Sequence, residues 1–247
     1  MKKLFTSFVS LVLIFSMVGN VFAESNKVNY EYSSALVQVL QLDEIFVGAV
    51  GVDGEFLVLN QQKAIDNGIS SDKIKEAKEK IKEYNKITKD VLEISPLLSF
   101  VGNQIQFDEI EAEKKGVSKE LIKSTKSDIE KINKEATKDI SANVTSTYAA
   151  ASCGGTNKYE DRFYGYDTYF DSCNTTRIIG LLTIAAGIVT IAAVITAVIN
   201  PPAGIAVGIA AGLLGIGAGA LTFASANGCG IYIRWSFDTP IWTGSQC

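Results

Sequence analysis

The chain has 247 residues, with 23 basic and 27 acidic side chains, a formal net charge of −4 and no histidine. A slightly acidic chain does not favour nucleic-acid binding, which needs a basic surface. The absence of histidine removes the commonest general base and every Ser-His-Asp or Cys-His catalytic arrangement. No glycine-rich phosphate loop follows a predicted strand, so the sequence indicates neither an enzyme nor a cofactor-binding protein.

The first residues have the pattern of a secretory signal peptide. Two lysines precede an apolar stretch over 4–18, and Val21-Phe22-Ala23 provides a small-residue cleavage site. The sequence therefore predicts a signal peptide over 1–23, a mature chain that begins at Glu24 and an extracellular location. An N-terminal anchor helix is the alternative, and it is disfavoured because the apolar stretch is short.

The first half of the mature chain is highly charged and is predicted to be mainly helical. A helix is expected over 29–46, followed by a short β-hairpin over 46–59, where Asp53-Gly54 stands between two β-rich runs. Two longer amphipathic helices are expected over 70–94 and 118–143, because apolar residues recur there every three or four positions. Their lysine and glutamate faces are expected to be solvated. No internal repeat of fixed period is evident.

A change of composition marks a boundary between two regions, 24–148 and 158–247. The linker over 149–157 is rich in small residues and contains the pair Gly154-Gly155. Flexible segments of this kind are where proteases cut. Both a plain linker and a second processing site near 149–151 remain open.

The second region contains a long apolar run, with no charged residue between Arg177 and Arg234. Asn200-Pro201-Pro202 divides it into two arms, 178–199 and 203–226, each long enough as a helix to cross a hydrocarbon core of roughly 30 Å. The second arm places glycines at small-xxx-small spacing, which lets helix backbones approach closely in lipid. An apolar helical hairpin is therefore predicted. Its membrane-inserting residues are expected to be Ile184, Ile188, Ile191, Ile195, Gly204, Gly208, Gly212, Leu213 and Leu214.

Four cysteines lie in the last hundred residues: Cys153, Cys173, Cys229 and Cys247. In an exported protein they predict two disulfides, with three possible connectivities. We favour Cys173–Cys229, because a helical hairpin returns its two ends to the same place, and this leaves Cys153–Cys247. No CxxC spacing and no histidine accompany them, so no metal site is predicted.

Aromatic residues flank the apolar run on both sides. The segment 158–173 is dense in tyrosine and phenylalanine, and 230–247 alternates as a terminal β-hairpin closed by Cys247. These aromatics could form a membrane-interface belt, a sugar- or wall-binding patch, or a small core around the disulfides. The residues assigned to the belt are Tyr166, Tyr169, Phe170, Trp235 and Trp242.

The predicted fold is mainly α: an amphipathic helical N-terminal region with a short β-hairpin, an apolar helical hairpin, and a disulfide-closed C-terminal β-hairpin. This arrangement resembles the precursor of a secreted bacterial killing peptide, a bacteriocin. The hairpin over 178–226 is similar to the hydrophobic hairpin of pore-forming colicins. The segments 166–173 and 230–234 resemble parts of small secreted proteins of Gram-positive bacteria. With four basic and five acidic residues, 151–247 departs from most bacteriocins, which are cationic.

We therefore expect a masked, membrane-active protein in which 24–148 covers the hairpin during export. Cleavage near 149–151 or a receptor would release the hairpin to permeabilise a target membrane. The expected partners are the lipid membrane of a target cell and an immunity protein or processing protease, with no nucleic acid. The alternatives are a non-toxic secreted or cell-surface globular binding protein with the hairpin as its core, and a two-span membrane protein. The last is disfavoured because the proline turn has no lysine or arginine.

Overall fold

The structure is a computed structural model that describes residues 40, 42–101, 104–142, 153–162, 165–236 and 239–247, with the backbone alone at 136–142, 236 and 239. The predicted signal peptide, most of the helix expected over 29–46 and the first residues of the expected linker lie outside the described residues. Within that expected helix, a 3-10 turn, η2, covers Glu44–Phe46.

The first elements confirm the predicted β-hairpin and the first long helix. Strands β1 (Val50–Asp53) and β2 (Phe56–Leu59) pair antiparallel, a short helix α3 (Gln61–Asp66) follows, and α4 covers Ser71–Ile94. The buried positions of α4 recur every three or four residues, which is the periodicity seen in the sequence.

The same order of elements then occurs again. After the 3-10 turn η3 (Ser95–Leu97) come β3 (Leu98–Val101), β4 (Gln104–Phe107), α5 (Glu109–Lys114) and α6 (Lys119–Ala142). Helix α6 confirms the helix predicted over 118–143, whereas β3, β4 and α5 were not predicted.

The chain therefore contains an internal repeat, contrary to the expectation that it has none. In each unit an asparagine on the long helix binds both backbone groups of a strand residue. Asn85 accepts from the amide of Leu57 and donates to its carbonyl, each at 2.8 Å. Asn133 does the same at Ile105, at 3.0 and 2.8 Å. Leu57 and Ile105 are 48 positions apart, as are Asn85 and Asn133. We call 49–94 repeat 1 and 97–142 repeat 2.

The local geometry of the two repeats agrees in further details. Asn60 and Asp108 are the N-caps of the two short helices, and each accepts a hydrogen bond at 2.9 Å from the amide three positions on. Gly68 and Gly116, both with a φ of +76°, form the turn between short and long helix. The asparagine that binds both backbone groups of a strand residue, the N-cap of the short helix and the left-handed glycine thus recur at the same 48-residue offset.

The second region forms a four-stranded antiparallel sheet with four helices inserted between its central strands. The strands are β5 (Lys158–Arg162), β6 (Gly165–Phe170), β7 (Ile231–Ser236) and β8 (Thr239–Ser245), in the order β5-β6-β7-β8. The helices are α7 (Ser172–Thr183), α8 (Ile188–Ile199), α9 (Ala203–Ile216) and α10 (Ala218–Ala224). The fold is thus mixed α/β, with helices, small antiparallel sheets and two disulfides. The strands β7 and β8 belong to this larger sheet.

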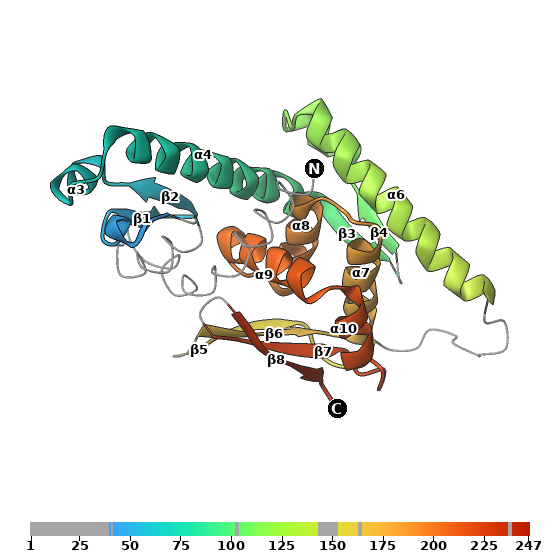
Figure 1. Ribbon diagram of the computed structural model, residues 1–247. Helices are drawn as coiled ribbons and strands as arrows, with labels where there is room; N and C mark the ends of the chain where they lie inside the picture. The colour runs from blue at the N-terminus through green and yellow to red at the C-terminus, as the bar shows by residue number, and fades with distance from the viewer. Residues whose placement is uncertain (1–39, 41, 102–103, 143–152, 163–164, 237–238) are drawn as a thin grey trace.

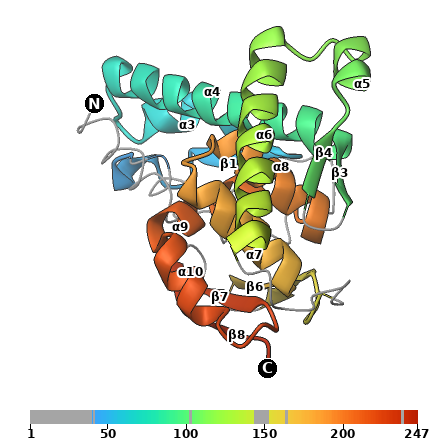
Figure 2. The ribbon, with the colours of Figure 1, turned by 90° about the vertical axis from the view of Figure 1, so that its right-hand side faces the viewer.

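The elements are stacked in three layers (Figure 1). The two repeats form one outer layer, α7–α10 form the middle layer, and the four-stranded sheet forms the other outer layer. Helix α4 contacts α8 and α9, and α6 contacts α7. Figure 2 shows α6 running across the middle layer, with the sheet below.

Neither predicted apolar arm is a continuous helix. The first arm breaks at 184–187, where Ala185 has a φ of +53°, and the second breaks at Gly217, with a φ of +80°. Positive φ values end a right-handed helix, so each arm becomes two shorter helices. In the part of the chain that the structure describes, no single helix is long and apolar enough to cross a bilayer. Only α8 and α9 together pass that test, as a pair bent by 118°.

The favoured disulfide connectivity was wrong. The bonds are Cys153–Cys173 and Cys229–Cys247, with Cα–Cα distances of 5.3 and 5.8 Å. Antiparallel pairing of β5 with β6 brings the residues before β5 beside those after β6, and the pairing of β7 with β8 does the same for the second bond. The ends of the apolar helices are held together by the β6–β7 ladder instead. Two disulfides are compatible with an extracellular location.

Candidate functional site

The residues predicted to enter a membrane lie inside the protein. Those that are buried are Ile191, Ile195, Gly204, Gly208, Gly212 and Leu213; those that are half-buried are Ile184, Ile188 and Leu214. Helices α7–α10, which we call the apolar helices, carry one charged residue, Arg177. The sheet covers one side of this layer, and the repeats contact α7, α8 and α9 on the other side, whereas Phe223 on α10 is 86% exposed. This covered layer is the candidate functional site.

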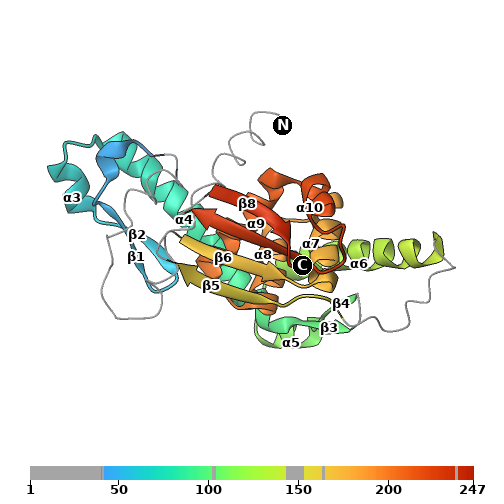
Figure 3. The same cartoon turned by 90° about the horizontal axis from the view of Figure 1, so that it is seen from below.

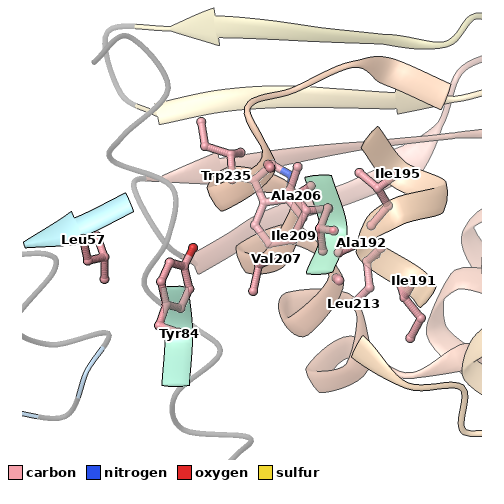
Figure 4. Packing of buried hydrophobic residues seen from close by; sticks show 14 of the residues in the cluster. Leu57, Tyr84, Ile191, Ala192, Ile195, Ala206, Val207, Ile209, Leu213 and Trp235 are labelled. Atoms are coloured by element: carbon pink, nitrogen blue, oxygen red, sulfur yellow. The ribbon is translucent and has the colours of Figure 1, made fainter. Parts of the chain in front are cut away.

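The sheet forms the first cover, with Trp235 at its centre. The indole of Trp235 is 1% exposed and donates a hydrogen bond at 3.0 Å to the hydroxyl of Thr168. Its ring packs against α9 where Gly212 leaves room, because a Cβ at Gly212 would lie 2.5 Å from the ring. Figure 4 shows Trp235 in one cluster with residues of α8 and α9. At Gly212 the small-residue spacing therefore accommodates a strand side chain.

Repeat 1 forms part of the second cover. The phenol of Tyr84, on α4, is buried and donates a hydrogen bond at 2.9 Å to the carbonyl of Gly204 on α9. Burial raises the pKa of Tyr84 well above its ordinary value, so this side chain stays neutral and remains a donor. Figure 4 shows Tyr84 approaching the cluster from the side of the repeats.

Carboxylates from the repeats cap both central apolar helices. Glu55, in the hairpin turn of repeat 1, accepts hydrogen bonds from the amides of Ala203 and Gly204 at 2.9 and 3.5 Å. Asp128, on α6, accepts from the amide of Gly187 at 2.9 Å and from the hydroxyl of Thr190 at 3.0 Å. These groups are the N-termini of α9 and α8, where a negative charge is stabilised by free N–H groups and the helix dipole. No sequence pattern pointed to either residue.

Glu55 makes the stability of the protein depend on pH. Burial raises the pKa of Glu55 above 4.5, and the hydrogen bonds from Gly204 and Ala203 lower it by less. The folded protein therefore holds this proton more tightly than the unfolded chain does. The resulting stability is fully present below the unfolded pKa and is lost as the pH rises through the folded pKa. Acidification thus strengthens the fold at this position.

We expect Glu55→Gln to remove this dependence, since glutamine does not titrate. The free energy of unfolding of E55Q, relative to the wild type, should therefore rise between acidic and neutral pH. Urea denaturation at a series of pH values measures it. Glu79→Gln, at an exposed position of the same repeat, is the control for losing a glutamate. A relative stability of E55Q that falls toward neutral pH would contradict the assignment.

The five aromatics assigned to an interface belt lie on two opposite faces of the sheet. Tyr166, Phe170 and Trp235 are buried on the inner face of the sheet, against the helices. Tyr169 and Trp242 lie on the outer face, where Tyr169 stacks on Tyr232 with ring centroids 5.8 Å apart. Figure 3 shows that no labelled helix crosses this outer face. The buried three form a core, so they do not make a belt in this state.

The outer face of the sheet also holds an ion-pair cluster that the sequence did not indicate. The carboxylate of Asp167 is buried and accepts hydrogen bonds at 3.1 Å from the Nε atoms of Arg162 and Arg234. These side chains meet because Asp167 faces Arg234 on the neighbouring strand. A buried carboxylate needs such partners, and two arginines satisfy it here.

No disulfide joins the repeats to the second region within the described residues. Both bonds lie inside 153–247, and no cysteine is free. The covalent path from the repeats to the sheet runs through 143–152. The described end of the expected linker, 153–157, is fixed in place: Gly155 packs against Cys229, and Thr156 binds Gln246.

The chain matches no protein-family model, and no curated protein or solved structure is significantly similar to it.

Proposed function

We propose that this chain is a secreted, bacteriocin-like, membrane-active protein. Its apolar segment 178–226 inserts into and permeabilises a target membrane after the repeats are displaced. The observation that carries the proposal is the pairing of a helical layer that has a single charged residue with a cover that no disulfide retains. An apolar helix layer that loses its cover must find other apolar surroundings, and a bilayer provides them.

Insertion requires a rearrangement of the apolar helices. Helices α8 and α9 have 12 and 14 residues. At a rise of about 1.5 Å per residue they are shorter than a hydrocarbon core of roughly 30 Å. Joining α7 to α8 across 184–187, and α9 to α10 across Gly217, would produce two arms of sufficient length. We therefore propose that the folded form is the resting state and that the continuous hairpin forms only in lipid.

Dye release from lipid vesicles tests the proposal. A protease site is placed within 143–152 of the mature chain, and the folded, oxidised protein is cut there. We expect the cut protein to release dye once the repeats dissociate, and the uncut protein to release little. Dissociation is followed by size-exclusion chromatography in the same samples, and protease-treated wild type is the control for incidental cleavage.

An absence of leakage from 153–247 after the repeats have dissociated would overturn the proposal. It would favour a non-toxic secreted or cell-surface binding protein with the apolar helices as its permanent core. The observation that favours this second function is the outer face of the sheet. There the stacked pair of Tyr169 and Tyr232 and the exposed ring of Trp242 lie beside the arginines around Asp167.

A further inference from the structure

Each repeat contributes one acidic side chain to one central apolar helix. Glu55 belongs to repeat 1 and binds the N-terminus of α9, and Asp128 belongs to repeat 2 and binds the N-terminus of α8. The two positions are not equivalent within the repeat: 48 positions before Asp128 stands Lys80, on α4. The two copies have therefore acquired different acidic contacts, one for each helix.

The apolar helices do not cap themselves at these ends. Gly187 and Pro202 occupy the N-cap positions of α8 and α9, and neither makes a side-chain cap hydrogen bond. A helix N-terminus has four amides without a partner in the helix, and an amide without a partner is costly in apolar surroundings. The acceptors that the structure provides at Gly187 and Ala203 belong to the repeats.

We propose that Glu55 and Asp128 are positioning residues that hold α9 and α8 beneath the repeats, and that breaking both contacts is the step that uncovers the apolar helices. The inference rests on the proposed function and adds which contacts control it. Each carboxylate spans the boundary between the two regions, so displacement of either repeat removes one cap. Both repeats are then needed for full covering, which gives the duplication a role.

The charges around the two caps differ. Asp128 is also 3.8 Å from Lys131 on its own helix, and its side chain is 13% exposed. Glu55 is half-buried and, like the neutral phenol of Tyr84, binds Gly204; burial raises the pKa of Glu55, whereas its hydrogen bonds with Gly204 and Ala203 favour the charged form. Separation of the repeats from the helices, by cleavage or by a competing partner, breaks both contacts.

Amide hydrogen exchange in the full mature chain tests the inference directly. Glu55→Ala is expected to speed exchange at Ala203, and Asp128→Ala at Gly187, by about 2- to 30-fold, which corresponds to the loss of one helix cap. Each effect should be confined to the helix that lost its cap. Glu79→Ala in repeat 1 and Glu130→Ala in repeat 2 remove exposed glutamates and are the matched controls.

Asp128→Asn gives a further readout that remains interpretable if the alanine variants fold poorly. Asparagine is as good a cap as aspartate, so exchange at Gly187 should stay near the wild-type rate. Unchanged exchange at Gly187 and Ala203 in the alanine variants, or loss of protection in D128N as large as in D128A, would overturn the inference.

The double variant E55A/D128A connects these contacts to the membrane. With uncut protein we expect vesicle leakage at least about tenfold faster than in the wild type, as the two cap losses combine. If the alanine variants exchange faster, but protein whose repeats have been removed by cleavage causes no leakage, the capping roles of Glu55 and Asp128 are upheld and the membrane function is rejected. If the cut protein causes leakage, but neither alanine substitution changes amide exchange, the membrane function is upheld and the capping roles are rejected.

Discussion

Replacing Trp235 by alanine is expected to lower the free energy of unfolding by about 3–5 kcal/mol, the usual range for an aromatic residue removed from a packed core. Trp235 is 1% exposed, its ring fills the space above Gly212, and it lies 5.6 Å from the ring of Tyr166. The substitution would also leave the hydroxyl of Thr168 without its indole donor. Urea denaturation followed by far-UV circular dichroism measures the loss.

The second tryptophan of the chain is the matched control. Trp242 lies on the outer face of the same sheet and is 59% exposed. Trp242→Ala should therefore change the free energy of unfolding by less than about 0.5 kcal/mol. Similar losses in both variants would show that the sheet does not pack against α9 through its inner face.

Asn85→Ala and Asn133→Ala are each expected to cost about 1–3 kcal/mol, because each leaves the amide and the carbonyl of a strand residue without its partner. The two losses should be alike, since the hydrogen bonds at Leu57 and Ile105 have the same pattern in both repeats. Equilibrium unfolding of the two single variants in urea provides the comparison.

Lys86→Ala is the control for the asparagine variants. It follows Asn85 directly and forms an exposed ion pair with Asp90, which is worth no more than about 1 kcal/mol. Loss of stability in N85A alone would mean that repeat 2 is held by other contacts. Asn85 and Asn133 would then be equivalent in structure but would not contribute equally to the free energy of unfolding.

The repeat shows why part of the fold was not predictable from the sequence. Scattered positions are identical at the 48-residue offset, among them Gly68 with Gly116, Ser70 with Ser118, and Asn85 with Asn133. Single glycines, serines and asparagines are common in loops and on helices, so they produce no visible period. Their equivalence becomes evident once the hydrogen bonds pair each asparagine with its strand.

The disulfide connectivity was predicted wrongly for a related reason. A hairpin of two long helices would bring Cys173 to Cys229, whereas the structure places each cysteine by the strand next to it. The alternation in 230–247 correctly indicated strands but not their partners, because a strand pattern does not identify the neighbouring strand. The sheet order β5-β6-β7-β8 decides which cysteines meet.

The sequence by itself determined the local features of this protein: the hairpin at Asp53-Gly54, the amphipathic helices α4 and α6, the uncharged run after Arg177 and the exclusion of histidine-based catalysis. These depend on residue type and short-range periodicity. Tertiary structure alone decided where the apolar helices break, which surfaces cover them and which carboxylates cap them. Glu55 and Asp128 meet α9 and α8 across long stretches of chain, and contacts of that kind leave no periodic signal in the sequence.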